Sequence, residues 1–593
     1  MAVAVILTLL TATGCAGPGP RLAPAGPIAF RHHPPDGRDA VYDFEGDGRA
    51  DYAERFGADG APLRLLFDWD GDGRSDVDVP PPRLARGVVP HLVIILDSVP
   101  FELVREFHDH GRFAQFHPPG RVIAPFPVMT DLSLAELFGV APCVAMESQF
   151  YNTRRLNTGY FTYVRTTNAP WLDQVDYDLN YLAHGLAYTD PRPWFGHELR
   201  RIEDEVLQRP ADATFVGYSV GTSALGSRQG RAGHEYALDR VDRVCRWLIH
   251  TFAGRIQITL LSDHGHAIAD ARPSHSSGGS EWIDLPGLLR REGFRVTDRL
   301  TRPGDVVVPG FGMVTCAAVY TREPAAVTDA LIGHDRIRLA AYVTPDGAIA
   351  VTSREGRARI ESADSSEPRV SARAELPAGE PRASARAQAP FGAGPAELPG
   401  ERPVPRIALT RMKGTGDVGW ADPTADGGAR DRGDALRLRY VPIDGDPLRL
   451  LPILAGGLDA DPDGFADKAA WFAATADHEY PDCVYRLWRA FHGLMRFTPD
   501  VLLCVEDGSH CGSRLMTSLI GLKGAHGNMG AASSTGFVMS TAGPVPEAVR
   551  MEDLAEALAQ IGVRVRRAAP AEINAMTQRR EGAKNPSELS GLP

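Results

Sequence analysis

Residues 91–98 read HLVIILDS, a continuous apolar run that ends in an acid. A run without polar alternation is typical of a strand buried on both faces of a parallel sheet. Two similar runs follow, TFVGY at 214–218 and IQITLLS at 256–262, with an amphipathic helix predicted between them over 233–252. Strand, helix and strand in this order predict an α/β fold with a doubly wound, mostly parallel sheet.

The remaining chain divides into segments of different composition. With 593 residues, two or three structural units are expected. Residues 362–405 contain mainly Ala, Arg, Glu, Pro and Ser and are expected to form a disordered stretch. This stretch lies within the insertion that we assign to 321–479. We assign an N-terminal acidic-loop segment to 41–85, the core to 90–320 and 480–570, an inserted α+β cap region to 321–479, and a tail to 571–593.

The first residues have the features of an export signal. The apolar run AVAVILTLL at 2–10 is too short to cross a bilayer but suits a secretory signal. Gly14 directly precedes Cys15, as at a bacterial lipoprotein cleavage site. We therefore expect a signal peptide over 1–15, lipidation of Cys15, and a linker over 16–40. The protein would be exported to the periplasm or cell surface and would contact the membrane only through the lipid; a misassigned start codon is the alternative.

Charge and cysteine usage exclude some partners. The net charge is −12 and no basic stripe is present, so a nucleic-acid-binding surface is not expected. The six cysteines after Cys15 include no CxxC pair, which argues against a cysteine zinc site. Cys504 and Cys511 could form a disulfide in an oxidising compartment, or remain free buried thiols. The oligomeric state is not predicted.

Two acidic loops precede the core. In the first loop, Gly48 stands at the sixth position, where an EF-hand-type calcium loop needs a sharp turn. The second loop matches this spacing through the ninth position. We expect both loops to bind calcium in a structural role; two solvated acidic turns are the alternative. The candidate positions are Asp43, Glu45, Asp47, Arg49, Asp51 and Glu54 in loop 1, and Asp68, Asp70, Asp72, Arg74 and Asp76 in loop 2.

Four separate segments place reactive residues at strand ends or helix starts, where α/β active sites collect. Asp97 directly follows HLVIIL, and Thr130 ends APFPVMT at the start of a predicted helix. Asp263 and His264 lie in SDHGH after ITLL, and His526 lies in KGAHGN. Carboxylates and imidazoles are suitable zinc ligands, and a bound metal activates a hydroxyl nucleophile. The set therefore indicates a metal-dependent hydrolase.

In this order, the four motifs resemble the alkaline phosphatase superfamily and, within it, the type I phosphodiesterase/nucleotide pyrophosphatase branch. The resemblance covers residues 90–320 and 480–570. It implies hydrolysis of a small phosphate ester with one or two ions of zinc or another divalent transition metal. It also implies that Asp97, Asp263 and His264 bind one metal, that Thr130 is the nucleophile, and that His526 belongs to the second metal.

The second metal site departs from the family pattern. A D-x-x-G-H-like motif is expected after TFVGY, but Ser223 and Ser227 stand where its Asp and His would be. Neutral hydroxyls substitute poorly for these ligands. The protein could work with one strong site plus His526, or recruit other ligands, or be an inactive member that binds a partner at the cell surface. The residues available for recruitment are His234, His266 and His510.

A rival hydrolase class also fits one motif. Residues 217–221, GYSVG, match the G-x-S-x-G nucleophile elbow and follow a predicted strand. Ser219 would then be the nucleophile of a metal-free serine esterase, with Asp263 and His526 as its partners. This interpretation gives Asp97 and Thr130 no role, and removal of metal would distinguish the two classes.

Overall fold

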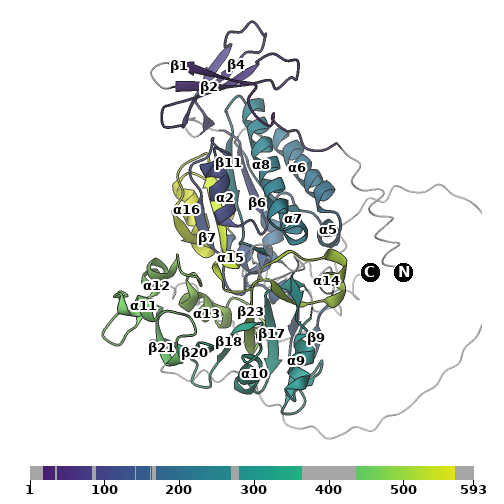
Figure 1. Cartoon of the computed structure of the whole chain (residues 1–593), viewed down its shortest axis with the longest axis vertical. Coiled ribbons are helices and arrows are strands. Elements are labelled where there is room, and N and C mark those ends of the chain that lie inside the picture. Colours follow the sequence, from purple (N-terminus) through teal and green to yellow (C-terminus); the bar gives the residue numbers. More distant parts are fainter. Residues whose placement is uncertain are drawn as a thin grey trace, which may run out of the picture.

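The computed structural model describes residues 18–33, 37–82, 89–140, 142–159, 162, 169–210, 212–268, 280–310, 312–363 and 436–567. An N-terminal meander, a central α/β unit and a second long sheet follow one another down the long axis of the molecule (Figure 1). No helix in these ranges is long and apolar enough to cross a membrane. Cys15, the tail and all but the first two residues of 362–405 lie outside the described residues.

The N-terminal unit is an antiparallel meander of strands β1 to β5. It packs on the end of α8 (Arg231–Thr251), where the ring of Phe44 stacks on His250 with centroids 4.0 Å apart. The prediction of a linker over 16–40 is partly wrong, because β1 and the first four of the six residues of β2 lie there. All of β1 is exposed, so no hydrophobic alternation marks it in the sequence. The strands are β1 (Ala29–His33), β2 (Gly37–Tyr42), β3 (Tyr52–Phe56), β4 (Pro62–Phe67) and β5 (Val77–Val79).

The central sheet carries the predicted α/β core. Its strand order is β10-β6-β11-β26-β7-β27, and β26 is the one strand antiparallel to its neighbours. The three apolar runs of the sequence are the three adjacent parallel strands at one side. The strands are β6 (His91–Leu96), β7 (Gly120–Ile123), β10 (Thr214–Ser219), β11 (Gln257–Leu261), β26 (Thr535–Ser540) and β27 (Ala548–Arg550).

Helices cover both faces of this sheet, which explains why β6 is apolar throughout. Leu92, Ile94 and Leu96 pack with α2 (Phe101–Asp109), α6 (Pro191–Leu207) and α8. Val93 and Ile95 pack with the opposite layer, formed by α3 (Thr130–Leu137), α5 (Tyr181–Ala187) and α16 (Met551–Gln560). The prediction of a doubly wound, mostly parallel sheet is confirmed for this unit.

The second long sheet has the order β14-β15-β17-β23-β18-β19-β20-β21-β22. Its strands come from both sides of the predicted core boundary at residue 320, so core and insertion share it. The strands are β14 (Arg295–Val296), β15 (Asp305–Val307), β17 (Cys316–Thr321), β18 (Ile337–Val343), β19 (Ile349–Ser353), β20 (Gly356–Ser362), β21 (Arg437–Gly445), β22 (Ala466–Asp467) and β23 (Val501–Val505).

The remaining elements are shorter, and one of them, α7 (Gly221–Gln229), packs against α6 and α8 in the central unit. The six cysteines in the described residues are free and buried, Cys504 and Cys511 included. These elements are η2 (Met146–Ser148), η3 (Pro170–Gln174), α7 (Gly221–Gln229), α9 (Leu285–Arg291), α10 (Pro324–Leu331), α11 (Leu451–Ala455), α12 (Lys468–Thr475), α13 (Cys483–Phe491), α14 (Arg514–Ile520), α15 (Ala531–Ser534) and the short strands β8 (Phe150–Tyr151), β9 (Leu156–Asn157), β12 (Ala267–Ile268), β13 (Glu281–Trp282), β16 (Met313–Val314), β24 (Ser509–Gly512) and β25 (Gly524–Ala525).

Candidate metal and nucleophile site

The predicted site residues meet at the carboxyl ends of the parallel strands. Asp97 directly follows β6, and Asp263 and His264 follow β11, which pairs with β6 in parallel. Thr130 is the first residue of α3. The adjacent strand β10 holds this edge in place, because the carbonyl of Ser219 accepts a hydrogen bond from the Asp97 amide at 3.1 Å. Open α/β sheets bind their ligands at this edge.

The side chains of these residues converge on one point. One ligand atom each from Asp97, Asp263 and His264 lies within 4.8 Å of the others. The Thr130 hydroxyl lies 3.3 Å from His264 Nε2. The ring of His526 lies beside that of His264, with centroids 4.2 Å apart, and its Nδ1 bonds the Val128 carbonyl at 2.9 Å. The structure therefore brings all five predicted residues together.

The electrostatics of this group favour a bound cation. Burial and the adjacent Asp97 carboxylate raise the pKa of Asp263 well above its usual value. Asp263 Oδ2 lies 3.3 Å from His264 Nε2. Burial lowers the pKa of His264, so its imidazole is kept neutral, the form that ligates metal. Two buried carboxylates and a neutral imidazole fit one divalent ion.

A chain of hydroxyl groups holds Asp97, and sequence reasoning missed most of it. Tyr218 donates to Asp97 Oδ2 at 2.5 Å, and Ser98 donates to Oδ1 at 2.6 Å. Ser223 bonds Ser98 at 3.0 Å and Tyr188 at 2.9 Å. Ser223, which stands where the resemblance predicts a ligand Asp, therefore supports the Asp97 carboxylate through the Ser98 hydroxyl. The one signal in the sequence for the role of Tyr218 is its place next to the carboxyl end of β10, the edge of the sheet at which Asp97 lies.

No carboxylate stands at 223 or 227, where the resemblance of the sequence motifs predicts ligands of a second metal. Ser223 is committed to the hydroxyl chain described above. His234 and His266 are buried and bond each other, Nε2 to Nδ1, at 2.9 Å. His510 lies elsewhere, bonded to Ser280 and Thr517 through its two ring nitrogens. In the described part of the core, the Asp97, Asp263 and His264 group is the one set of three or more acidic, His or Cys side chains whose ligand atoms lie within 4.8 Å of one another.

The geometry of Ser219 does not support a serine esterase. Ser219 is fully buried at the end of β10, and its hydroxyl donates to Glu198 Oε2 at 2.7 Å. Glu198 also accepts the backbone amides of Val220 and Gly221, at 3.0 and 2.9 Å. A triad nucleophile needs a base within hydrogen-bond reach. Within the described ranges, no histidine bonds Ser219.

The two acidic loops connect strands of the N-terminal meander. In each loop the first Asp, Asp43 or Asp68, accepts backbone amides of the following turn. The ligand atoms of Asp68, Asp70 and Asp76 lie within 4.8 Å of one another. Glu54 differs from its predicted role, because its carboxylate is buried and accepts the Tyr52 hydroxyl at 3.1 Å.

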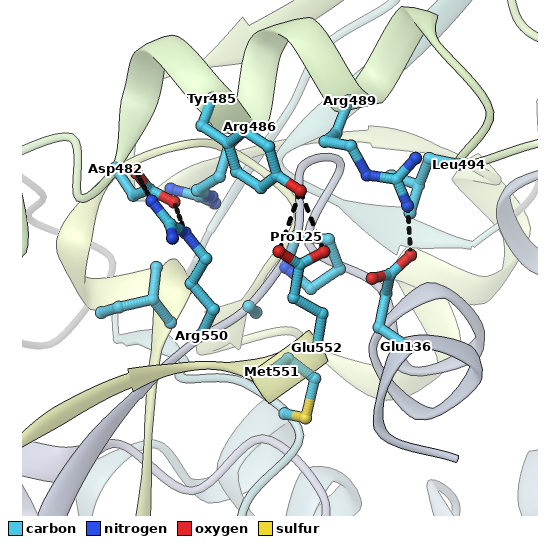
Figure 2. A pocket seen from close by; sticks show the side chains of 12 residues that line it. Pro125, Glu136, Asp482, Tyr485, Arg486, Arg489, Leu494, Arg550, Met551 and Glu552 are labelled. Atoms are coloured by element: carbon cyan, nitrogen blue, oxygen red, sulfur yellow. Dashed lines mark hydrogen bonds and ion pairs between the residues drawn. The ribbon is translucent and has the colours of Figure 1, made fainter. Parts of the chain in front are cut away.

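In a separate pocket beside α13, the charged side chains that line the pocket bond one another and fill most of its space. Arg550 bonds Asp482, Arg489 bonds Glu136, and Tyr485 bonds both oxygens of Glu552 (Figure 2). The free volume is about 20 Å³, room for a single water molecule. This network is therefore internal packing between α13, α3 and the start of α16.

Comparison with known proteins gives structural neighbours but no sequence match. No family model matches the chain, and no curated protein does. A murine ectonucleotide pyrophosphatase/phosphodiesterase 5, inactive and in complex with AMP, is 10% identical, with a TM-score of 0.38 over 80% of this chain and 95% of that one. The human counterpart is 10% identical, with a TM-score of 0.37 over the same shares.

A second kind of neighbour is the phosphonoacetate hydrolase from Sinorhizobium meliloti in complex with phosphonoformate. It is 9% identical, with a TM-score of 0.36 over 83% of this chain and 97% of that one. The first enzyme class is the one that the four sequence motifs resemble. With TM-scores below 0.5, these neighbours do not define the chemistry of this chain.

Proposed function

We propose that this protein is a metal-dependent hydrolase of small phosphate esters of the phosphodiesterase type. The observation that carries the proposal is the meeting of Asp97, Asp263 and His264 within 4.8 Å, with the Thr130 hydroxyl 3.3 Å from His264 Nε2. We propose that these three residues hold zinc or a similar divalent ion, and that Thr130 is the nucleophile. The substrate is a phosphate ester, in keeping with the resemblance stated above.

A divalent ion held there would neutralise phosphate charge and lower the pKa of a neighbouring hydroxyl. The protein's own contribution is orientation. Tyr218 and Ser98 fix both oxygens of Asp97, and the Ser98 amide donates to Asp263 Oδ1 at 3.1 Å. Thr130 sits at the start of α3, and the N-terminal end of a helix favours an anion. His526, whose side chain is half-buried, adds a second imidazole beside that of His264.

The serine residues at 223 and 227 lead us to propose one fully formed metal site. The alternative, an inactive protein that binds a partner at the cell surface, predicts the same fold and no turnover. We further propose that the acidic loops bind calcium to stabilise the meander, and that the protein is exported and anchored through Cys15.

Hydrolysis assays test the proposal directly. We expect the zinc-loaded protein to cleave a para-nitrophenyl phosphodiester, and Thr130→Ala to lose that activity while keeping its unfolding temperature. The matched control is Thr251→Ala, an exposed threonine at the end of α8, which should be fully active. Equal turnover by wild type and Thr130→Ala would refute Thr130 as the nucleophile, and no turnover by either would favour the binding protein.

A further inference from the structure

Ser98 has a backbone conformation that is unusual for a residue with a side chain. Its φ is 62°, in the left-handed region that favours glycine, and it follows Asp97 just beyond the end of β6. A residue other than glycine keeps this conformation where the surrounding structure enforces it, often at a functional site. Ser98 is fully buried, so its contacts show what enforces the turn.

The left-handed turn joins the end of β6 to the segment that follows β11. The Ser98 amide donates to Asp263 Oδ1 at 3.1 Å. The next amide, that of Val99, donates to Ser262 Oγ at 2.9 Å, and Ser262 Oγ donates to the His264 carbonyl at 2.5 Å. The turn therefore fixes the segment that carries two of the candidate ligands against the strand end that carries the third.

The side chain of the same residue holds the Asp97 carboxylate. The Ser98 hydroxyl donates to Asp97 Oδ1 at 2.6 Å, and its oxygen lies 3.0 Å from that of Ser223. A hydroxyl group has a single proton and an ionised carboxylate can only accept, so Ser98 accepts its second bond from Ser223. Ser223 in turn accepts from the Tyr188 hydroxyl at 2.9 Å. The hydroxyl chain therefore runs in one direction, toward Asp97.

These bonds determine which carboxylate oxygens face the metal position. With Asp263 Oδ1 bound to the Ser98 amide, Asp263 Oδ2 lies 3.3 Å from His264 Nε2. Asp97 Oδ1, which accepts the Ser98 hydroxyl, lies 3.9 Å from the same nitrogen. The amide and the hydroxyl of one residue thus orient two ligands that come from different strands. Such partners behind a metal ligand contribute to its affinity for the metal.

We propose that Ser98 is a positioning residue that orients both carboxylates for a divalent ion, and that its left-handed backbone lowers the stability of the fold; this rests on the proposed function. Glycine at position 98 would adopt the same backbone without strain and keep the amide bonds, but it has no hydroxyl. Alanine would also lack the hydroxyl and would keep the strain. The two variants therefore separate the contribution of the side chain from that of the backbone.

Isothermal titration of the metal-free protein with Zn²⁺, and urea unfolding, test this role. We expect Ser98→Gly and Ser98→Ala both to bind Zn²⁺ at least about 10-fold more weakly than wild type, the usual effect of removing a partner behind a metal ligand. Without metal, Ser98→Gly should unfold at a higher urea concentration than Ser98→Ala, because glycine relieves the left-handed backbone. With Co²⁺ as the probe, the visible absorption spectrum of both variants should differ from that of wild type, a change that a purely structural role would not cause.

The matched control is Ala253→Gly. Ala253 follows α8 with φ 46°, so glycine relieves the same kind of strain outside the candidate site, and the Zn²⁺ affinity should stay at the wild-type value. A Zn²⁺ affinity of Ser98→Gly within about twofold of wild type would overturn the orienting role of Ser98. Equal urea midpoints of Ser98→Gly and Ser98→Ala would overturn the role of the strained backbone.

Binding measurements also separate this inference from the proposed function, because they need no turnover. If wild type binds Zn²⁺ and cleaves no phosphodiester, the proposed hydrolase fails, and the affinities of the two Ser98 variants still decide the positioning role. If wild type binds no Zn²⁺, both proposals fail.

Discussion

Tyr218→Phe removes one hydroxyl from behind the candidate metal site and nothing else. That hydroxyl donates to Asp97 Oδ2 at 2.5 Å, and Tyr218 is 2% exposed. The ring packs edge-on against Trp171, with centroids 5.2 Å apart, and phenylalanine keeps this contact. The variant therefore tests whether the bond to Asp97 serves metal binding.

The expected size follows from the role of the bond. Partners that orient a metal ligand from behind typically contribute 10- to 100-fold in affinity, about 1.4 to 2.7 kcal/mol. The hydroxyl chain through Ser98 still holds the other oxygen of Asp97, so we expect a value near the lower end. Isothermal titration of the metal-free protein with Zn²⁺, wild type against Tyr218→Phe, measures it.

The matched control is Tyr236→Phe in α8. That hydroxyl makes no hydrogen bond among the described residues, so the Zn²⁺ affinity should be unchanged. A Tyr218→Phe affinity within about twofold of wild type would refute the reasoning, because Asp97 would then bind no metal or need no orientation.

Three further expectations follow from other parts of the molecule. Gly265→Ala places a Cβ 2.3 Å from the Ala532 carbonyl oxygen, so we expect it to lower the free energy of unfolding by about 1–3 kcal/mol or more and to weaken Zn²⁺ binding. The control is Gly310→Ala, where the Cβ meets open space, and it should change neither the stability nor the Zn²⁺ affinity. Calcium at a hundredfold excess over its Kd should add about 2.7 kcal/mol of stability, and Asp68→Asn should reduce that gain; no response of wild type in thermal unfolding would contradict calcium binding. Burial lowers the pKa of His91 and His510 from 6.5 to about 4, so the unfolded chain takes up their protons first and stability should fall as pH drops from 6.5 to 4. Urea unfolding measures the slope, which should be shallower in His91→Gln; a flat profile would count against buried neutral imidazoles.

The sequence predicted the central sheet because its signals are local. The runs before Asp97 and Asp263 are continuous and apolar, and they form adjacent parallel strands whose ends place both carboxylates together. Thr130 and His526 were identified by their motifs. The second long sheet was less predictable, because β17 and β18 both pair with β23, far along the chain. Such pairing follows from packing that no local pattern records.

The supporting residues could not be predicted for the same reason. Tyr188 and Ser223 are separated by 35 residues, and Tyr218 and Asp97 by 121, yet each pair shares a hydrogen bond. The sequence indicates only that Ser223 replaces a ligand. Its hydrogen bond to Ser98 joins residues 125 positions apart, so it follows from the fold and not from a local pattern.

The central claim is that Asp97, Asp263 and His264 together hold a divalent metal ion. The most direct measurement is the zinc content per chain after loading and dialysis, by elemental analysis, for wild type and for Asp97→Asn. The structure predicts one tightly held ion in wild type and a loss of most of it in the variant, with the fold intact by circular dichroism. A zinc content that is zero in wild type, or equal in both proteins, would contradict the claim.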